Sequence, residues 1–100
     1  MHMTIYNSTG KPLSEKEWED KFKIISAAYA DLKSCVGGFD DDGDEKLRSS
    51  GVVLLAGNHV MEEGKEVWGL ADKEFIYVPI DRSNQNIVTT MKHEWIHIYL

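Results

Sequence analysis

Apolar residues in the first third of the chain recur at intervals of three and four, the spacing of one face of an α-helix. Ser14 and Glu17 have the spacing of a capping box, so the helix is expected to begin there. Gly37 and Gly38 cannot hold helical geometry cheaply and are expected to end it. The apolar face of this helix consists of Trp18, Phe22, Ile25, Ala28, Tyr29 and Leu32.

The middle of the chain changes to a β-type pattern. Residues 37–50 are polar and rich in glycine and serine, so we expect a loop there. Residues 52–56 form an apolar, β-branched run that is typical of a buried strand. The segments 66–70 and 75–80 are two further strand candidates, and the short link between them predicts a hairpin. Pro79 has no backbone N–H, so its strand is expected to lie near an edge or to end there.

The two ends of the chain complete the order of elements. Residues 3–7 are expected to form a short strand or an ordered arm, and residues 58–65 a turn. Ser83 or Asn84 is the expected cap of a last helix that continues to Leu100. Its apolar stripe is Val88, Met91, Trp95 and Ile98, and its neighbouring face carries Thr90, His93, Glu94 and His97. The order helix, strands, helix predicts an α+β domain.

Composition limits the classes of partner. A length of 100 residues suits one domain, and we assign residues 1–100 to it. Eleven basic and seventeen acidic residues give a net charge of −6, which argues against nucleic acid or a membrane surface as a partner. A single cysteine, Cys35, excludes an internal disulfide and favours a reducing, cytoplasmic location. We expect Cys35 to be a small packing residue, and we assign His2 no role.

The closing segment MKHEWIHIYL carries the strongest chemical signal. On a helix, His93 and His97 lie one turn apart and could present two imidazoles to one ion. Zinc accepts neutral histidine nitrogen and activates a bound water, whose proton Glu94 could take as a general base. The sequence therefore predicts a zinc site with these three residues. The alternative is two ordinary histidines and a solvated carboxylate on an amphipathic helix.

The segment FIYVPIDRSNQNIVTTMKHEWIHIYL, residues 75–100, resembles the active-site half of the zincin metallopeptidases. In that fold a long helix backs a small twisted sheet of three to four strands, and a following helix carries the motif. The resemblance implies that His93 and His97 bind zinc, that Glu94 is the general base, and that a peptide or protein substrate pairs with an edge strand of the sheet. We expect that strand to come from the pair 66–70 and 75–80.

The chain departs from the zincin pattern at the third metal ligand. Metzincins place a glycine three residues after the second histidine, where this chain has Leu100. Gluzincins and aspzincins take an acidic ligand from a later segment, so the chain is expected to be gluzincin-like and to be the N-terminal part of a longer domain. Without a third ligand it is expected to be inactive. Alternative ligands are His59, Glu62, Glu63, the terminal carboxylate of Leu100, or a residue from a second copy of the chain. For His59 we prefer an exposed turn residue.

Two further interpretations of the sequence compete with the enzyme. A non-catalytic interaction module on the zincin scaffold could bind a partner or a second copy through the apolar helix end and an unpaired sheet edge. The run Asp40 to Glu45 resembles part of a calcium-binding loop, but positions 1 and 12 lack ligands, so a solvated acidic loop is expected. Trp68 and Tyr77 are expected to pack in the core or across strands.

Overall fold

The computed structural model describes residues 3–72 and 74–100. His2, and Lys73 in the turn expected at 71–74, lie outside the described residues. No helix in the described part of the chain is long and apolar enough to cross a membrane. The elements are β1 (Ile5–Ser8), α1 (Glu15–Cys35), α2 (Asp41–Ser49), β2 (Gly51–Leu55), β3 (Val60–Glu62), β4 (Lys65–Val67), β5 (Leu70–Ala71), β6 (Phe75–Pro79) and α3 (Asn84–Tyr99).

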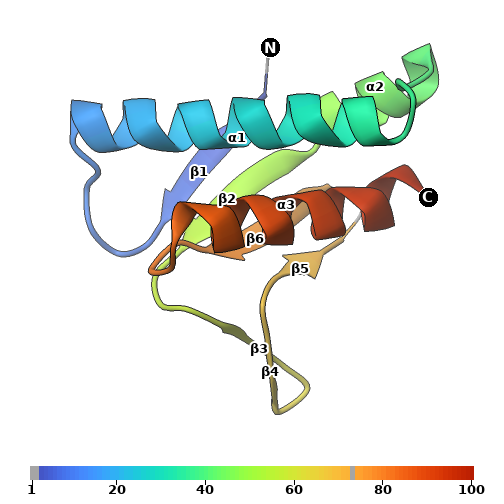
Figure 1. Cartoon of the computed structure of the whole chain (residues 1–100). Coiled ribbons are helices and arrows are strands. Elements are labelled where there is room, and N and C mark those ends of the chain that lie inside the picture. Colours follow the sequence, from blue (N-terminus) through green and yellow to red (C-terminus); the bar gives the residue numbers. More distant parts are fainter. Residues whose placement is uncertain (1–2, 73) are drawn as a thin grey trace.

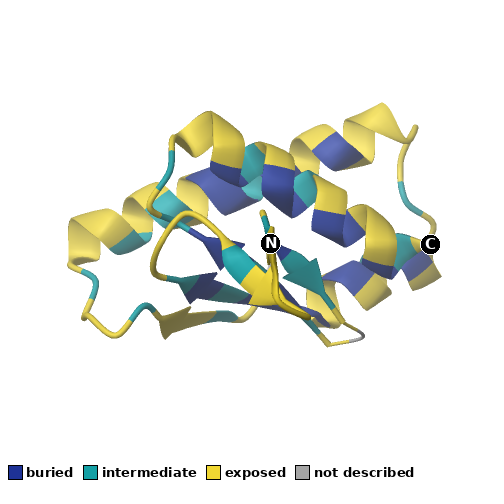
Figure 2. Ribbon diagram, turned by 90° about the horizontal axis from the view of Figure 1, so that it is seen from below, coloured by how far each residue is buried: buried dark blue, intermediate teal, exposed yellow. Residues whose placement is uncertain are grey.

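A four-stranded mixed sheet has the strand order β1-β2-β6-β5. The strands β1, β2 and β6 run parallel, and β5 is antiparallel to β6 at one edge. The helices α1 and α3 pack against each other on one face of this sheet, as Figures 1 and 2 show. The strands β3 and β4 form a separate antiparallel hairpin. The predicted α+β class is confirmed.

The core lies between the sheet and the two helices. Alternate residues of β2 and β6 point into it, as the period of a strand requires, and they are fully buried (Figure 2). Trp95 on α3 is also fully buried and meets Tyr29 of α1 edge to face, with ring centroids 5.6 Å apart. The buried strand residues are Val52, Leu54, Ile76 and Val78.

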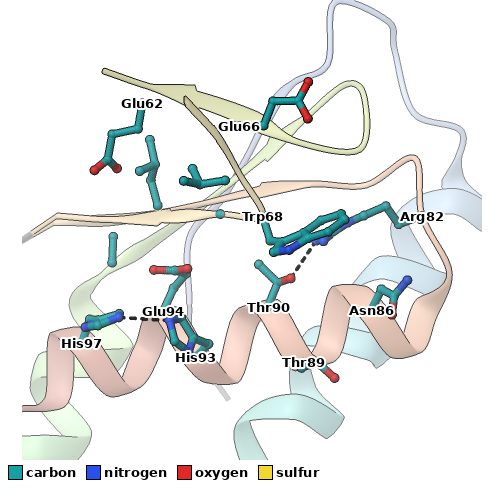
Figure 3. Close-up of a pocket in the computed structure, with 14 residues that line it drawn as sticks. Glu62, Glu66, Trp68, Arg82, Asn86, Thr89, Thr90, His93, Glu94 and His97 are labelled. Carbon is teal, nitrogen blue, oxygen red and sulfur yellow. Dashed lines mark hydrogen bonds between the residues drawn. The ribbon is translucent and has the colours of Figure 1, made fainter. Parts of the chain in front are cut away.

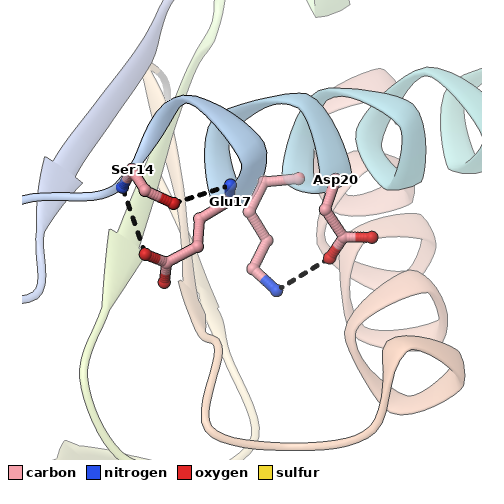
Figure 4. A network of polar contacts seen from close by, with 4 residues as sticks. Ser14, Glu17 and Asp20 are labelled. Carbon is pink, nitrogen blue, oxygen red and sulfur yellow. Dashed lines mark hydrogen bonds and ion pairs between the residues drawn. The ribbon is translucent and has the colours of Figure 1, made fainter.

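The start and end of α1 agree with the sequence prediction. Ser14 Oγ accepts a hydrogen bond from the backbone N–H of Glu17 at 3.2 Å, and Glu17 accepts one from the backbone of Ser14 at 3.1 Å (Figure 4). At the other end, Gly37 and Gly38 adopt φ angles of 78° and 101°, and Gly38 N donates to the carbonyl of Lys33. The capping box and the glycine stop are therefore confirmed.

The prediction of a loop at residues 37–50 is wrong for most of this segment, because α2 occupies residues 41–49. The side chain of Asp40 caps this helix by accepting a hydrogen bond from Gly43 N at 2.7 Å. Acidic side chains fill its first turn and basic ones its last, which favours the helix dipole. Gly43 is buried against the ring of Tyr99, where a side chain would collide. The glycine that suggested a loop is needed for packing against α3.

The hairpin expected between 66–70 and 75–80 is only partly correct. Leu70 and Ala71 of β5 pair with Tyr77 and Ile76 of β6, as expected. Residues 65–67 instead belong to β4, which pairs with β3 inside the segment expected to be a turn. The two-residue connection Glu63-Gly64 has φ angles of 51° and 80°, which suit the right-handed twist of a tight hairpin.

Three side chains are more exposed than their patterns predicted. Cys35 is exposed, so the packing role expected for it is wrong. Trp68 is 66% exposed and does not pack in the core. Phe22 is 45% exposed although it shares the apolar spacing of α1. Tyr77 is half-buried beside Phe75, as expected, with ring centroids 6.2 Å apart.

A hydrogen bond from the Tyr29 hydroxyl to Asp44 joins α1 to α2. This bond lowers the pKa of Asp44, while burial and the same bond raise the pKa of Tyr29. The lowered Asp44 pKa stabilises the fold above about pH 4, and this contribution is lost as pH falls through the folded-state pKa. The raised Tyr29 pKa stabilises the fold below about pH 10, and this contribution is lost as pH rises through the folded-state pKa.

Replacing Tyr29 by phenylalanine is expected to lower the free energy of unfolding by about 1 kcal/mol near neutral pH, because the ring packing stays and the charge-assisted hydrogen bond is lost. The difference from wild type should shrink below about pH 4 and above about pH 10. Urea titrations across this range measure it. A difference that does not change with pH would contradict the role assigned to this bond.

Candidate metal centre

A pocket of about 790 Å³ lies between α3, the edge strand β5 and the hairpin β3–β4. Figure 3 shows the helix α3 as its floor, with the side chains of His93, Glu94 and His97 directed into it. The acidic side chains Glu62 and Glu66 come from the hairpin on the opposite side. The pocket thus collects the polar face of α3 that the helical spacing predicted.

The register of α3 is set by its buried side. Ser83 caps the helix by accepting a hydrogen bond from Asn86 N, which confirms the first of the two expected caps. Met91 and Trp95 are fully buried, and the ring of Trp95 packs against Tyr29 of α1. Because residues on a helix are about 100° apart, fixing Trp95 in the core turns His93 and His97 toward the pocket.

The two histidines are arranged as a pair of metal ligands would be. His93 Nε2 and His97 Nε2 are 3.1 Å apart, and the two rings are nearly perpendicular. Two nitrogens bound to one tetrahedral zinc at about 2.05 Å lie about 3.3 Å apart. The side chains of His93, Glu94 and His97 each offer a ligand atom, and these atoms lie within 4.8 Å of one another. The donor set and its spacing therefore fit zinc.

Glu94 has an unusual environment for a charged residue. It is 7% exposed, and its carboxylate accepts no hydrogen bond from the described residues. Burial raises the pKa of Glu94, the charge of Glu62 adds to this rise, and His93 and His97 oppose it. A carboxylate held in this state can accept a proton more readily than one exposed to water. Its position between the two histidines suits a general base.

The backbone of Gly69 forms the wall behind Glu94. A Cβ atom at residue 69 would lie 2.6 Å from Thr90 Cγ2, 3.1 Å from the carbonyl oxygen of Tyr77 and 3.2 Å from Glu94 Oε2. Only a residue without a side chain lets β5 approach α3 this closely. Gly69 therefore sets the distance between the edge strand and the carboxylate.

The substitution Gly69→Ala is expected to lower the free energy of unfolding by about 1–3 kcal/mol, because the added methyl group overpacks this contact. Thr90→Ser removes the methyl group that lies closest to residue 69 and keeps the hydroxyl. The double variant should therefore recover part of the loss, which thermal or urea unfolding can measure. Purely additive costs in the double variant would show that Gly69 does not contact Thr90 in this way.

The alternative third ligands from upstream do not join the cluster of ligand atoms. His59 is exposed, in agreement with the preferred interpretation as an exposed turn residue. Its ring contacts Asn58 and Glu66. Glu63 lies in the hairpin turn. Glu62 lines the pocket beside Glu94 and His97 (Figure 3), outside the group of ligand atoms within 4.8 Å. Its carboxylate adds negative charge above the two histidines, which favours a cation there.

Several pocket residues were not found by sequence reasoning. Gly69 and Trp68 lie just before β5, and Arg82 lies just before the cap of α3. Arg82 Nη2 donates to Thr90 Oγ1 at 2.9 Å, and its guanidinium lies 5.6 Å from the ring centroid of Trp68. The available signal was weak: a lone arginine in the polar link before a helix that carries a metal motif.

No family model matches the chain, and no match was found among curated proteins or solved structures.

Proposed function

We propose that the protein is a zinc-dependent peptidase of the zincin type, related to the gluzincins rather than the metzincins. The observation that carries this proposal is the pair of Nε2 atoms 3.1 Å apart, beside a buried carboxylate in one pocket. The two rings are also close enough to hydrogen-bond to each other, so the buried carboxylate of Glu94 is what favours a metal site over an ordinary histidine pair. The resemblance of residues 75–100 to zincins supports the same proposal.

Each residue of the site has a separate task. His93 and His97 would hold the ion through Nε2, with the proton of each ring on Nδ1. When bound, zinc would supply polarisation of a carbonyl group and a lowered pKa of water. Glu94 takes a proton from the attacking water and passes it to the leaving amine nitrogen. Its lack of hydrogen-bond donors among the described residues leaves both carboxylate oxygens free for these transfers.

The edge strand β5 is the proposed binding place for the substrate backbone. Leu70 and Ala71 line the pocket and pair with β6 on one side only, within the described sheet. An extended peptide can add to such an edge through main-chain hydrogen bonds. Gly69 would then bring the peptide backbone next to Glu94. The sequence left open which strand of the pair 66–70 and 75–80 binds the substrate. The proposal now assigns this role to residues 70–71.

The proposal is tested by incubating the protein with a mixture of unrelated peptides and identifying the products by mass spectrometry. Although no third protein ligand joins the two histidines among the described residues, we expect excess zinc to support cleavage, which should require the added metal and stop with a chelator. The assay uses excess zinc, because two protein ligands hold the ion less tightly than three. Stoichiometric zinc without cleavage of any peptide would remove the peptidase assignment. In that case, self-association in size-exclusion chromatography would favour the interaction module.

A further inference from the structure

The guanidinium of Arg82 lies at one end of the same pocket and makes two hydrogen bonds. Its Nε donates to the carbonyl of Pro79 at 3.3 Å, and its Nη2 donates to Thr90 Oγ1 at 2.9 Å. The ring of Trp68 covers one side of the group, with 5.6 Å between Cζ and the ring centroid (Figure 3). Contacts with one backbone carbonyl, one side-chain hydroxyl and one aromatic ring define both the position and the plane of the guanidinium.

The charge of Arg82 has no partner among the described residues. No described carboxylate lies within ion-pair distance, although the guanidinium is partly buried and this burial lowers its pKa. The acidic neighbours are engaged elsewhere: Glu66 contacts His59 at 3.5 Å, and Asp81 accepts a hydrogen bond from Gly57 N. Five N–H donors are available on arginine, and two are used. A partly desolvated, unpaired cation is costly unless an anion completes it.

The distance from Arg82 to the metal centre fits a peptide substrate. Arg82 donates a hydrogen bond to Thr90, and the position of Thr90 on α3 lies four residues, a rise of about 6 Å, before that of Glu94. An extended peptide advances about 3.3 Å per residue. A group on the first or second residue from the cleaved bond would therefore reach Arg82.

We propose that Arg82 and Trp68 form a subsite for a carboxylate of the peptide substrate, within two residues of the cleaved bond. The inference rests on the proposed function. The free N–H groups of Arg82 would bind the carboxylate as a fork, and the exposed ring of Trp68 would cover its aliphatic stem. The carboxylate can come from an acidic side chain or from the C-terminus of the peptide, since both present the same planar anion.

The test is a titration of the zinc-free protein, kept in chelator so that a carboxylate cannot bind the metal directly. Three tripeptides are compared: blocked Ala-Glu-Ala, blocked Ala-Gln-Ala, and acetylated Ala-Ala-Ala with a free C-terminus. Binding is followed by the indole N–H resonance of Trp68, which lies beside residue 82 and is present in the wild type and in every variant. We expect at least one carboxylate peptide to bind about tenfold more tightly than the glutamine peptide. Which of the two it is identifies the source of the carboxylate.

Two variants with the same change in charge separate a specific subsite from general attraction. Arg82→Gln should remove the preference for the carboxylate peptide, whereas Arg48→Gln, on the exposed side of α2, should keep it. Arg82→Lys keeps the charge without the fork and should lose most of the preference. Equal binding of all three peptides to wild type, or a preference that survives in Arg82→Gln, would overturn the inference. Because zinc is absent, these outcomes do not depend on the metal centre.

Discussion

Replacing His93 and His97 together by alanine is expected to abolish stoichiometric zinc binding. The two Nε2 atoms are the neutral donors of the cluster, and their separation of 3.1 Å matches the span of one tetrahedral ion. Neither ring is buried, so the double variant should fold with nearly unchanged stability. Elemental analysis after dialysis against micromolar zinc should give close to one zinc per wild-type chain and close to none per variant chain.

The matched control is His59→Ala, which removes an exposed histidine outside the cluster and should leave zinc binding unchanged. Each single variant, His93→Ala or His97→Ala, should weaken binding strongly, because one imidazole cannot replace the pair. Equal zinc contents in wild type and in the double variant would remove the metal site. The alternative of an ordinary histidine pair on an amphipathic helix would then be preferred.

Glu94→Gln is expected to keep the fold and the bound zinc while lowering peptide cleavage by about 10²–10⁴-fold. Glutamine has the same shape and fills the space beside Gly69, but it cannot accept a proton from water at neutral pH. Loss of the general base should lower kcat far more than it raises KM. Steady-state cleavage of the best peptide found in the zinc-dependent assay measures both constants.

The control for this change is Glu45→Gln, which removes an exposed carboxylate from α2 and should leave cleavage unaltered. Zinc content and the unfolding midpoint must be measured for both variants, so that loss of metal or of fold is recognised. Cleavage by Glu94→Gln at the wild-type rate would rule out the role of Glu94 as the base. It would leave the binding of zinc by the histidines intact.

The sequence predicted those parts of the fold that depend on local periodicity and capping. The capping box at Ser14, the glycine stop after α1 and the buried stripe of α3 all follow from neighbouring residues. The helix α2 was missed because its glycine and aspartates are typical of loops. It packs closely against α3 through Gly43 and Tyr99, which are far apart in sequence. Distant packing of this kind leaves no local pattern.

The candidate site also divides into residues found from a local pattern and residues placed by packing between distant segments. His93, Glu94 and His97 were found because one helix carries all three at a spacing that brings them together. Gly69 and Arg82 were not found, because their places beside Thr90 depend on how β5 and β6 pack against α3. Trp68 was expected to pack in the core or across strands, yet it lies in the link between β4 and β5 and covers Arg82. Its apolar character alone did not distinguish these positions.

Anomalous X-ray scattering at the zinc edge, from crystals grown with zinc, tests the metal centre most directly. We expect one strong anomalous peak within about 2.1 Å of both His93 Nε2 and His97 Nε2, beside the carboxylate of Glu94. Such a peak would also show which further group completes the coordination. A peak elsewhere, or two histidine rings joined by a hydrogen bond with no peak between them, would contradict the proposed site.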